Sequence, residues 1–334
     1  MKKLRTIDVY TIPLFFVSLA AAILRSIALL TSFDTVSMHF DNKTAITIGG
    51  IIVAVSIIAF LSYLFLGEKE TELIARSDNA ASYIPAGIVS TALLFMGANL
   101  LSTSLSASAI YFGITRILGL ISGVLAILSI VPFFLSVFIE KRDDLYKAAF
   151  SLCIVVFLAI YATLLYFNKQ YHPTNSPNRL VDQMAYLFSA IFFLYEARIP
   201  LGRAKWRGYV AFGLCGTLLC AYSSIPSIIL YFVNGYIVSE SLAETILTLT
   251  LMIFIGSKVL QVKTLTPDTE CETAKAITTL ATIREEEIKA HRSLAHTQDS
   301  NNMEEKDDTV DAENYSFDIP SPEVTTDFNI DDAT

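Results

Sequence analysis

Charged residues are scarce in this sequence. Lysine, arginine, aspartate and glutamate make up 17% of its 334 residues, hydrophobic residues make up 53%, and the mean hydropathy is +0.54. A soluble protein of this length would carry roughly a quarter charged residues. The composition therefore excludes an ordinary soluble domain. With a formal net charge of −8, we also expect no nucleic-acid partner.

The residue types that usually bind metals or catalyse reactions are also sparse. The histidines all stand outside the apolar runs, at His39, His172, His291 and His296. The cysteines lack the spacing of a structural zinc site and stand at Cys153, Cys215, Cys220 and Cys271. No glycine-rich phosphate loop is present. We therefore expect no cofactor, no metal and no catalytic activity.

What the chain does have is a series of apolar runs about twenty residues long, the length of helix that crosses about 30 Å of hydrocarbon. They cover Val9–Thr31 and residues 45–66, 83–105, 115–139, 146–167, 180–201, 208–233 and 242–262. The first run is too long for a typical signal-peptide core, so we expect it to be retained. Residues 1–263 are predicted to form an all-α integral membrane domain, a bundle of about eight transmembrane helices in a lipid bilayer.

Basic residues are distributed unequally between the two sides of this predicted bundle. Twelve stand on the side of the N-terminus: Lys2, Lys3, Arg5, Lys69, Arg76, Lys141, Arg142, Lys147, Arg203, Lys205, Arg207 and Lys263. Four stand on the other side: Lys43, Arg116, Lys169 and Arg179. Cytoplasmic segments are enriched in lysine and arginine. Both termini are therefore predicted to be cytoplasmic.

The C-terminal part has a different composition. Residues 264–334 contain 18 acidic and 5 basic residues, a net charge of −13, whereas the rest of the chain carries +5. Apolar residues recur near helical spacing from Ile277 to Ile288, so residues 264–297 are predicted to form a cytoplasmic helical segment able to bind a protein partner. Residues 298–334 are acidic with few large apolar residues, which predicts a disordered tail.

The candidate site consists of the few polar residues inside or beside the apolar runs: Arg25, Asn99, Asp182, Glu196 and Arg198. Ionisable residues in membrane helices are costly and usually face protein or water, so they are functional candidates. Arg25 and Asp182 lie at similar predicted depth. Either they neutralise one another, or Arg25 extends to the interface while Asp182 lies among the headgroups.

Glu196 has no obvious partner at its depth. It either contacts water, a cation or a polar solute, or it bonds Arg203 or Arg207 in the basic turn that follows. Arg198 is two positions further along the helix and therefore points elsewhere. Asn99 is an isolated amide, for which a hydrogen bond between helices is the ordinary interpretation.

Pro226 stands inside the seventh apolar run, where it removes a backbone hydrogen bond. The serines around it, Ser223, Ser224 and Ser227, either satisfy the freed carbonyl groups or line a polar path. We favour the structural role.

Two short stretches, together under a tenth of the chain, carry a resemblance to known sequences. They are Leu24-Arg25-Ser26-Ile27-Ala28-Leu29-Leu30 with Phe33-Asp34, and Phe193-Leu194-Tyr195-Glu196-Ala197-Arg198. They resemble stretches of uncharacterised multi-pass membrane proteins of Gram-positive bacteria. The resemblance implies a bacterial plasma membrane and no known activity.

The predicted external segments are short, the longest being residues 168–179, and leave no room for a folded external domain. Large ligands are therefore disfavoured. We expect the chain to bind or transport a small solute within the helix bundle. The alternative is a non-transporting signalling or scaffold protein that acts through its cytoplasmic tail.

Overall fold

The computed structural model describes residues 6–34, 39–67, 73–75, 80–106, 113–133, 144–168, 177–199, 201, 204–235 and 241–264. All of them belong to one compact unit of the chain, Met1–Thr282. The predicted cytoplasmic helix lies outside the described residues, except for Thr264. The predicted disordered tail of residues 298–334 lies entirely outside them.

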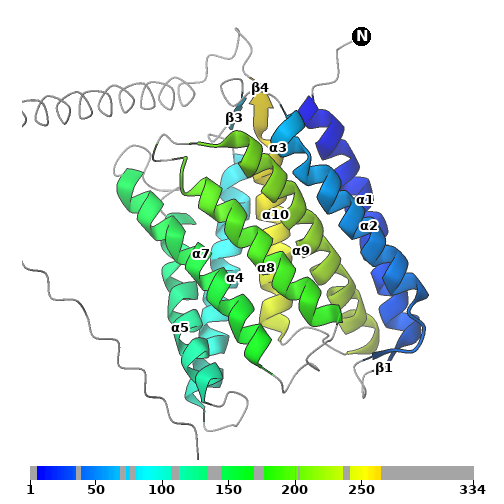
Figure 1. Cartoon of the computed structure of the whole chain (residues 1–334). Helices are drawn as coiled ribbons and strands as arrows, with labels where there is room; N and C mark the ends of the chain where they lie inside the picture. The colour runs from blue at the N-terminus through cyan, green and yellow to red at the C-terminus, as the bar shows by residue number, and fades with distance from the viewer. Residues whose placement is uncertain are drawn as a thin grey trace, which may run out of the picture. The chain divides into compact units, whose positions relative to one another are not determined.

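Helices dominate the described residues (Figure 1). They are α1 (Thr6–Ser32), α2 (Thr44–Leu61), α3 (Tyr63–Leu66), α4 (Ala80–Leu105), α5 (Ile114–Leu128), α7 (Asp144–Phe167), α8 (Pro177–Glu196), α9 (Trp206–Asn234) and α10 (Leu242–Leu260). The all-α prediction omitted two small antiparallel sheets. In one, β1 (Phe33–Asp34) pairs with β2 (His39–Phe40); in the other, β3 (Leu73–Ala75) pairs with β4 (Val262–Thr264).

Seven helical segments in the described ranges are long and apolar enough to cross a membrane. They are Val9–Ser32, Thr44–Leu66, Tyr83–Leu105, Ile114–Phe133, Ala148–Phe167, Trp206–Asn234 and Leu242–Leu260. The predicted helical membrane bundle is confirmed to this extent. Helix α8 is not among the seven, because polar residues in its first two turns, among them Arg179, Asp182 and Gln183, lower its hydropathy. The eighth crossing therefore stays a prediction.

Six helices close a ring in which each one contacts the next, in the order α4, α5, α7, α8, α9, α10 and back to α4. Helices α1 and α2 pack against α9 at the edge of this ring (Figure 1). Helix α9 thus contacts α1, α2, α8 and α10, and 83% of its most apolar window is buried. It is the central element of the described bundle.

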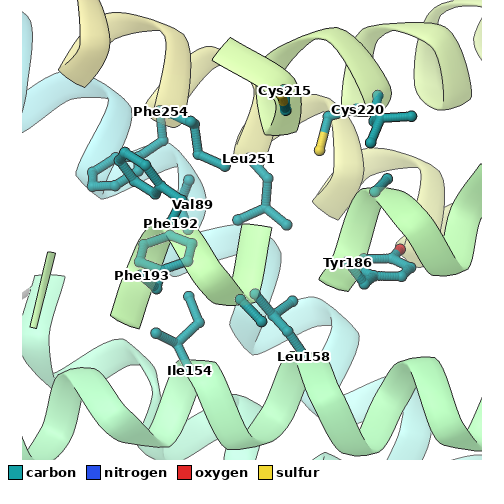
Figure 2. Packing of buried hydrophobic residues seen from close by; sticks show 14 of the residues in the cluster. Val89, Ile154, Leu158, Tyr186, Phe192, Phe193, Cys215, Cys220, Leu251 and Phe254 are labelled. Carbon is teal, nitrogen blue, oxygen red and sulfur yellow. The ribbon is translucent and has the colours of Figure 1, made fainter. Parts of the chain in front are cut away.

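Large apolar side chains fill the middle of the ring. Figure 2 shows Ile154 and Leu158 of α7 opposite the phenylalanines of α8 and α10. The Phe254 ring centroid lies 5.1 Å from that of Phe133 and 5.7 Å from that of Phe193. Such aromatic pairs stabilise a core beyond the area that they bury. We call Phe133, Phe193 and Phe254 the aromatic layer.

Glycines let α9 approach its neighbours closely. A Cβ atom at Gly213 would lie 2.3 Å from Val259 Cγ2 of α10, and one at Gly208 would lie 2.4 Å from the Tyr195 ring beside α9. Distances this short leave no room for a methyl group. The glycines of α9 therefore fix how closely α8 and α10 pack against it, and this packing positions the polar side chains described next.

Candidate functional site

Helix α8 presents two different faces along its length. The polar residues of one face are Asn178, Asp182, Tyr186, Ser189 and Glu196, at spacings of three, four or seven. The large hydrophobic residues most exposed on the helix are all leucines seven positions apart, namely Leu180 (61% exposed), Leu187 (42%) and Leu194 (38%). Helix α8 therefore turns its polar face toward the other helices and a leucine stripe outward.

Arg25 of α1 is fully buried and joins three helices. Its Nη1 atom donates a hydrogen bond to the backbone oxygen of Tyr222 on α9, at 2.6 Å. Its Nη2 atom donates to Oδ1 of Asn178 on α8, at 3.0 Å. The guanidinium carbon also lies 4.9 Å from the centroid of the Tyr222 ring. A buried guanidinium needs such partners, because desolvating an unpaired charge is costly.

Pro226 explains why the Tyr222 oxygen is available to Arg25. In an α-helix this oxygen would accept a hydrogen bond from the N–H group four residues later, which is position 226. Proline has no N–H group, so the acceptor is left without its helical partner. Arg25 supplies the missing donor. The serines also bond within α9, since Ser224 donates to the Cys220 oxygen and Ser227 to the Ser223 oxygen.

Asp182 lies in the same cluster as Arg25, although no direct ion pair joins the two among the described residues. The Asp182 carboxylate is buried and accepts a hydrogen bond from the Ser223 hydroxyl of α9. Asn178 and Asp182 are one turn apart on α8, and Tyr222 and Ser223 are adjacent on α9. The opposite charges of Arg25 and Asp182 attract each other across these bridging groups. We call Arg25, Asn178, Asp182, Tyr222 and Ser223 the arginine cluster.

A second buried carboxylate, Glu244 of α10, was missed by the sequence analysis. The Tyr186 hydroxyl donates to Glu244 Oε1 at 3.4 Å and lies 2.7 Å from the Thr248 hydroxyl. Ser241 caps α10 by accepting a hydrogen bond from the Glu244 backbone N–H group. Glu244 stands inside the eighth apolar run, which is the same signal that singled out Asp182.

Arg179 was counted as a charge of an external segment, whereas the structure places it inside a helix. It lies in the first turn of α8, is buried, and places its guanidinium carbon 5.4 Å from the centroid of the Tyr166 ring. In the described part of the chain, the buried ionisable acids and bases therefore include two arginines, Arg25 and Arg179, and two carboxylates, Asp182 and Glu244. Their formal charges cancel.

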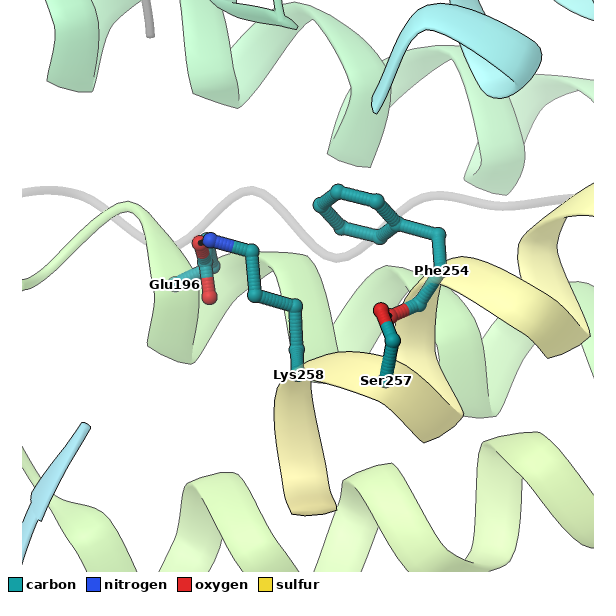
Figure 3. Close-up of polar contacts among 4 residues, drawn as sticks. All are labelled: Glu196, Phe254, Ser257 and Lys258. Atoms are coloured by element: carbon teal, nitrogen blue, oxygen red, sulfur yellow. Dashed lines mark hydrogen bonds and ion pairs between the residues drawn. The ribbon is translucent and has the colours of Figure 1, made fainter. Parts of the chain in front are cut away.

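Glu196 lies at the opposite end of α8 and pairs with a residue that was not predicted. Lys258 Nζ of α10 lies 3.3 Å from Glu196 Oε1, and both side chains are about one-fifth exposed (18% and 22%). Figure 3 shows Lys258 extending from α10 to Glu196. The other carboxylate oxygen, Oε2, is buried, and Glu196 also interacts with the Tyr209 side chain of α9. The predicted partner Arg203 lies outside the described residues, and Arg207 donates to the Gly67 backbone oxygen.

The Glu196–Lys258 pair should contribute measurably to stability because it is partly shielded from water. In a double-mutant cycle of Glu196→Gln and Lys258→Met, we expect a coupling free energy of about 0.5–1 kcal/mol, the upper part of the range for accessible pairs. Chemical unfolding in lipid bicelles measures it. A cycle of Glu196→Gln with Lys205→Met is the control and should show no coupling. Equal coupling in both cycles would contradict the pairing.

The remaining predicted residues are not joined to these clusters. The Arg198 guanidinium carbon lies 5.6 Å from the centroid of the Tyr195 ring, in the turn that follows α8. Asn99 is half-buried on α4, and its backbone oxygen accepts a hydrogen bond from the Ser102 hydroxyl of the same helix. The structure therefore brings together Arg25 and Asp182, and it separates Glu196 from them by fourteen positions of α8, about 21 Å at 1.5 Å per residue.

The described residues form a helical bundle in which seven segments are long and apolar enough to cross a membrane, with buried polar groups toward both ends of α8. Among the described residues, no group of three or more histidine, cysteine, aspartate or glutamate side chains is placed to hold a metal ion. The chain matches no protein-family model, no curated protein and no solved structure. The resemblance to membrane proteins of Gram-positive bacteria stays a prediction.

Proposed function

We propose that the chain binds a small polar solute at the arginine cluster and passes it through the helix bundle. In this proposal α8 is the sixth of eight membrane crossings, the membrane is a bacterial plasma membrane, and both termini are cytoplasmic. The arginine cluster then faces the outer half of the bilayer. The Glu196–Lys258 pair lies toward the cytoplasm.

Two observations support the crossing by α8. Its most exposed large side chains are the leucines of the outward stripe, while its charged groups are buried or paired. In addition, β3 pairs with β4. Five of the seven apolar segments lie between these two strands, and an odd number of crossings would leave the strands on opposite sides of the membrane. A crossing by α8 makes the number even.

The observation that carries the functional proposal is the burial of Arg25, Arg179, Asp182 and Glu244 together. Apolar residues of similar volume would usually be at least as stabilising as a buried charged network. Ionisable groups inside a membrane protein therefore point to function. Polar groups that hydrogen-bond one another across α1, α8, α9 and α10 are suited to bind a polar solute.

Passage through the bundle would require two barriers to open. The aromatic layer closes the ring between the two ends of α8. The Glu196–Lys258 pair lies beyond it, with Lys258 Nζ 5.6 Å from the centroid of the Phe254 ring. Because Phe254 and Lys258 are one turn apart on α10, a movement of this helix would shift both barriers together.

The experiment is a thermal-stability screen of the full chain in lipid nanodiscs with small cations, anions and neutral polar solutes. A ligand at 100 times its dissociation constant adds about 2.7 kcal/mol to the stability of the folded state. We expect solutes of at least one of these classes to stabilise the wild-type chain. The same solutes should not stabilise the Asp182→Asn variant. Asp41→Asn, an exposed carboxylate outside the helices, is the control and should be stabilised as the wild type is.

Stabilisation by none of the solutes would contradict the proposal. A chain that retains its cellular role with Asp182→Asn but loses it when truncated after Thr264 would favour the signalling or scaffold alternative.

A further inference from the structure

Two buried hydrogen-bond donors in the arginine cluster have no partner. They are Arg25 Nε and Asn178 Nδ2, and no described residue accepts a hydrogen bond from either atom. The two side chains are 0% and 1% exposed. Buried donors without an acceptor are costly and are rare in folded proteins. Arg25 and Asn178 are hydrogen-bonded to each other, so the two unpaired donors lie at one place in the fold.

The hydrogen bonds already made within the cluster determine what kind of group can bind these two free nitrogen atoms. Asn178 Oδ1 accepts from Arg25 Nη2, so the other end of the amide must be the NH₂ group. The Nη1 atom of Arg25 is engaged by the Tyr222 oxygen. A guanidinium has no acceptor atom. Whatever completes the cluster must therefore accept hydrogen bonds, from one N–H of Arg25 and one of Asn178.

The charges at this position favour an anion. Asn178 and Arg179 lie in the first turn of α8, a helix of 20 residues. The N-terminus of a helix carries a partial positive charge and binds anions readily. Arg25 adds a full positive charge at the cluster itself, and Arg179 adds another in the first turn of α8, where its guanidinium lies beside the Tyr166 ring. Asp182 opposes these charges from the next turn of α8, but it does not pair with the two free donors, since its carboxylate accepts from Ser223 instead.

We infer that Arg25 and Asn178 bind the carboxylate group of the transported solute. A carboxylate offers two oxygens side by side, which match two N–H donors from neighbouring side chains. This inference rests on the proposed function and names the chemical class of its solute. It assigns Asn178, which the sequence analysis passed over, as a binding residue.

The test compares acetate with acetamide and inorganic phosphate as ligands of the full chain in nanodiscs. We expect acetate to stabilise the wild-type chain and the uncharged acetamide and the larger phosphate to have much weaker effects. Asn178→Asp keeps an oxygen for Arg25 Nη2, removes the NH₂ donor and repels an anion. It should weaken acetate binding by at least about tenfold, the loss expected for one hydrogen bond to a charged group.

Two control variants should bind acetate as the wild type does. Asn99→Asp makes the same chemical change on α4, away from the cluster, and Ser189→Ala alters another buried polar residue of α8. Equal acetate binding by the wild type and Asn178→Asp would place the anion elsewhere and overturn the inference. If acetate does not stabilise the wild-type chain, the inference is also overturned. Bound water would then be the partner of the two donors.

The same measurements separate this inference from the proposed function. If cations or neutral solutes stabilise the chain and Asp182→Asn abolishes the effect, the proposed function holds and the carboxylate assignment is wrong. If no solute of any class stabilises the wild type, both are wrong.

Discussion

Replacing Arg25 by leucine should destabilise the folded bundle by about 3–5 kcal/mol, the cost of breaking a buried charge pair by removing one partner. Asp182 would remain buried without its nearby positive charge, and the Tyr222 oxygen would lose the donor that compensates for Pro226. Leucine fills much of the volume, so the loss reports mainly on charge and hydrogen bonding. Reversible unfolding in bicelles is the measurement.

The double variant distinguishes charge pairing from a general loss of packing. Asp182→Leu alone leaves Arg25 buried with less compensation, so it should also be strongly destabilising. Arg25→Leu with Asp182→Leu removes both charges and should cost less than the sum of the single variants, by about 1–3 kcal/mol. Strict additivity would mean that the two charges do not compensate each other in the fold.

A single methyl group at Gly213 should have the next largest effect. The added Cβ atom would lie 2.3 Å from Val259 Cγ2 and 3.1 Å from Phe192 Cδ2, so α9 and α10 would have to separate. Overpacking of this kind costs about 1–3 kcal/mol, more than the helix propensity of up to about 1 kcal/mol that alanine gains over glycine. We therefore expect Gly213→Ala to unfold at clearly lower denaturant.

Gly50→Ala is the matched control for this prediction. Apart from the backbone of its own helix, no atom lies within 4 Å of a Cβ built at Gly50, which is also inside a long apolar helix. The substitution should therefore be neutral or slightly stabilising. If both glycine variants behave alike, the close approach of α9 and α10 is not a determinant of stability.

The helices of this protein could be predicted closely from the sequence because length and hydropathy alone define them. The run predicted at residues 208–233 is α9, Trp206–Asn234, and the run at 242–262 is α10, Leu242–Leu260. Helix α8 begins at Pro177, three residues before the predicted start. The error arose because Asn178 and Arg179 are polar and were assigned to an external segment, whereas the structure buries both.

The partners of the polar residues were harder to predict, because they depend on contacts between distant parts of the chain. Arg25 and the Tyr222 oxygen are 197 positions apart, and the acceptor is a backbone atom that no residue type reveals. Pro226 was the only feature of the sequence that indicated a free backbone acceptor at this place in the helix. Glu244 and Lys258, by contrast, are charges inside an apolar run and could have been found by the reasoning applied to Asp182.

In the proposed topology α8 crosses the membrane and carries its polar face into the bilayer interior. The direct measurement is the insertion of a reporter enzyme, active only outside the cytoplasm, at Asn175 before α8, at Ala204 after it, and after Thr264. Eight crossings with cytoplasmic termini predict an active reporter at Asn175 and silent reporters at Ala204 and Thr264. Active reporters at both Asn175 and Ala204 would show that α8 does not cross and would contradict this topology.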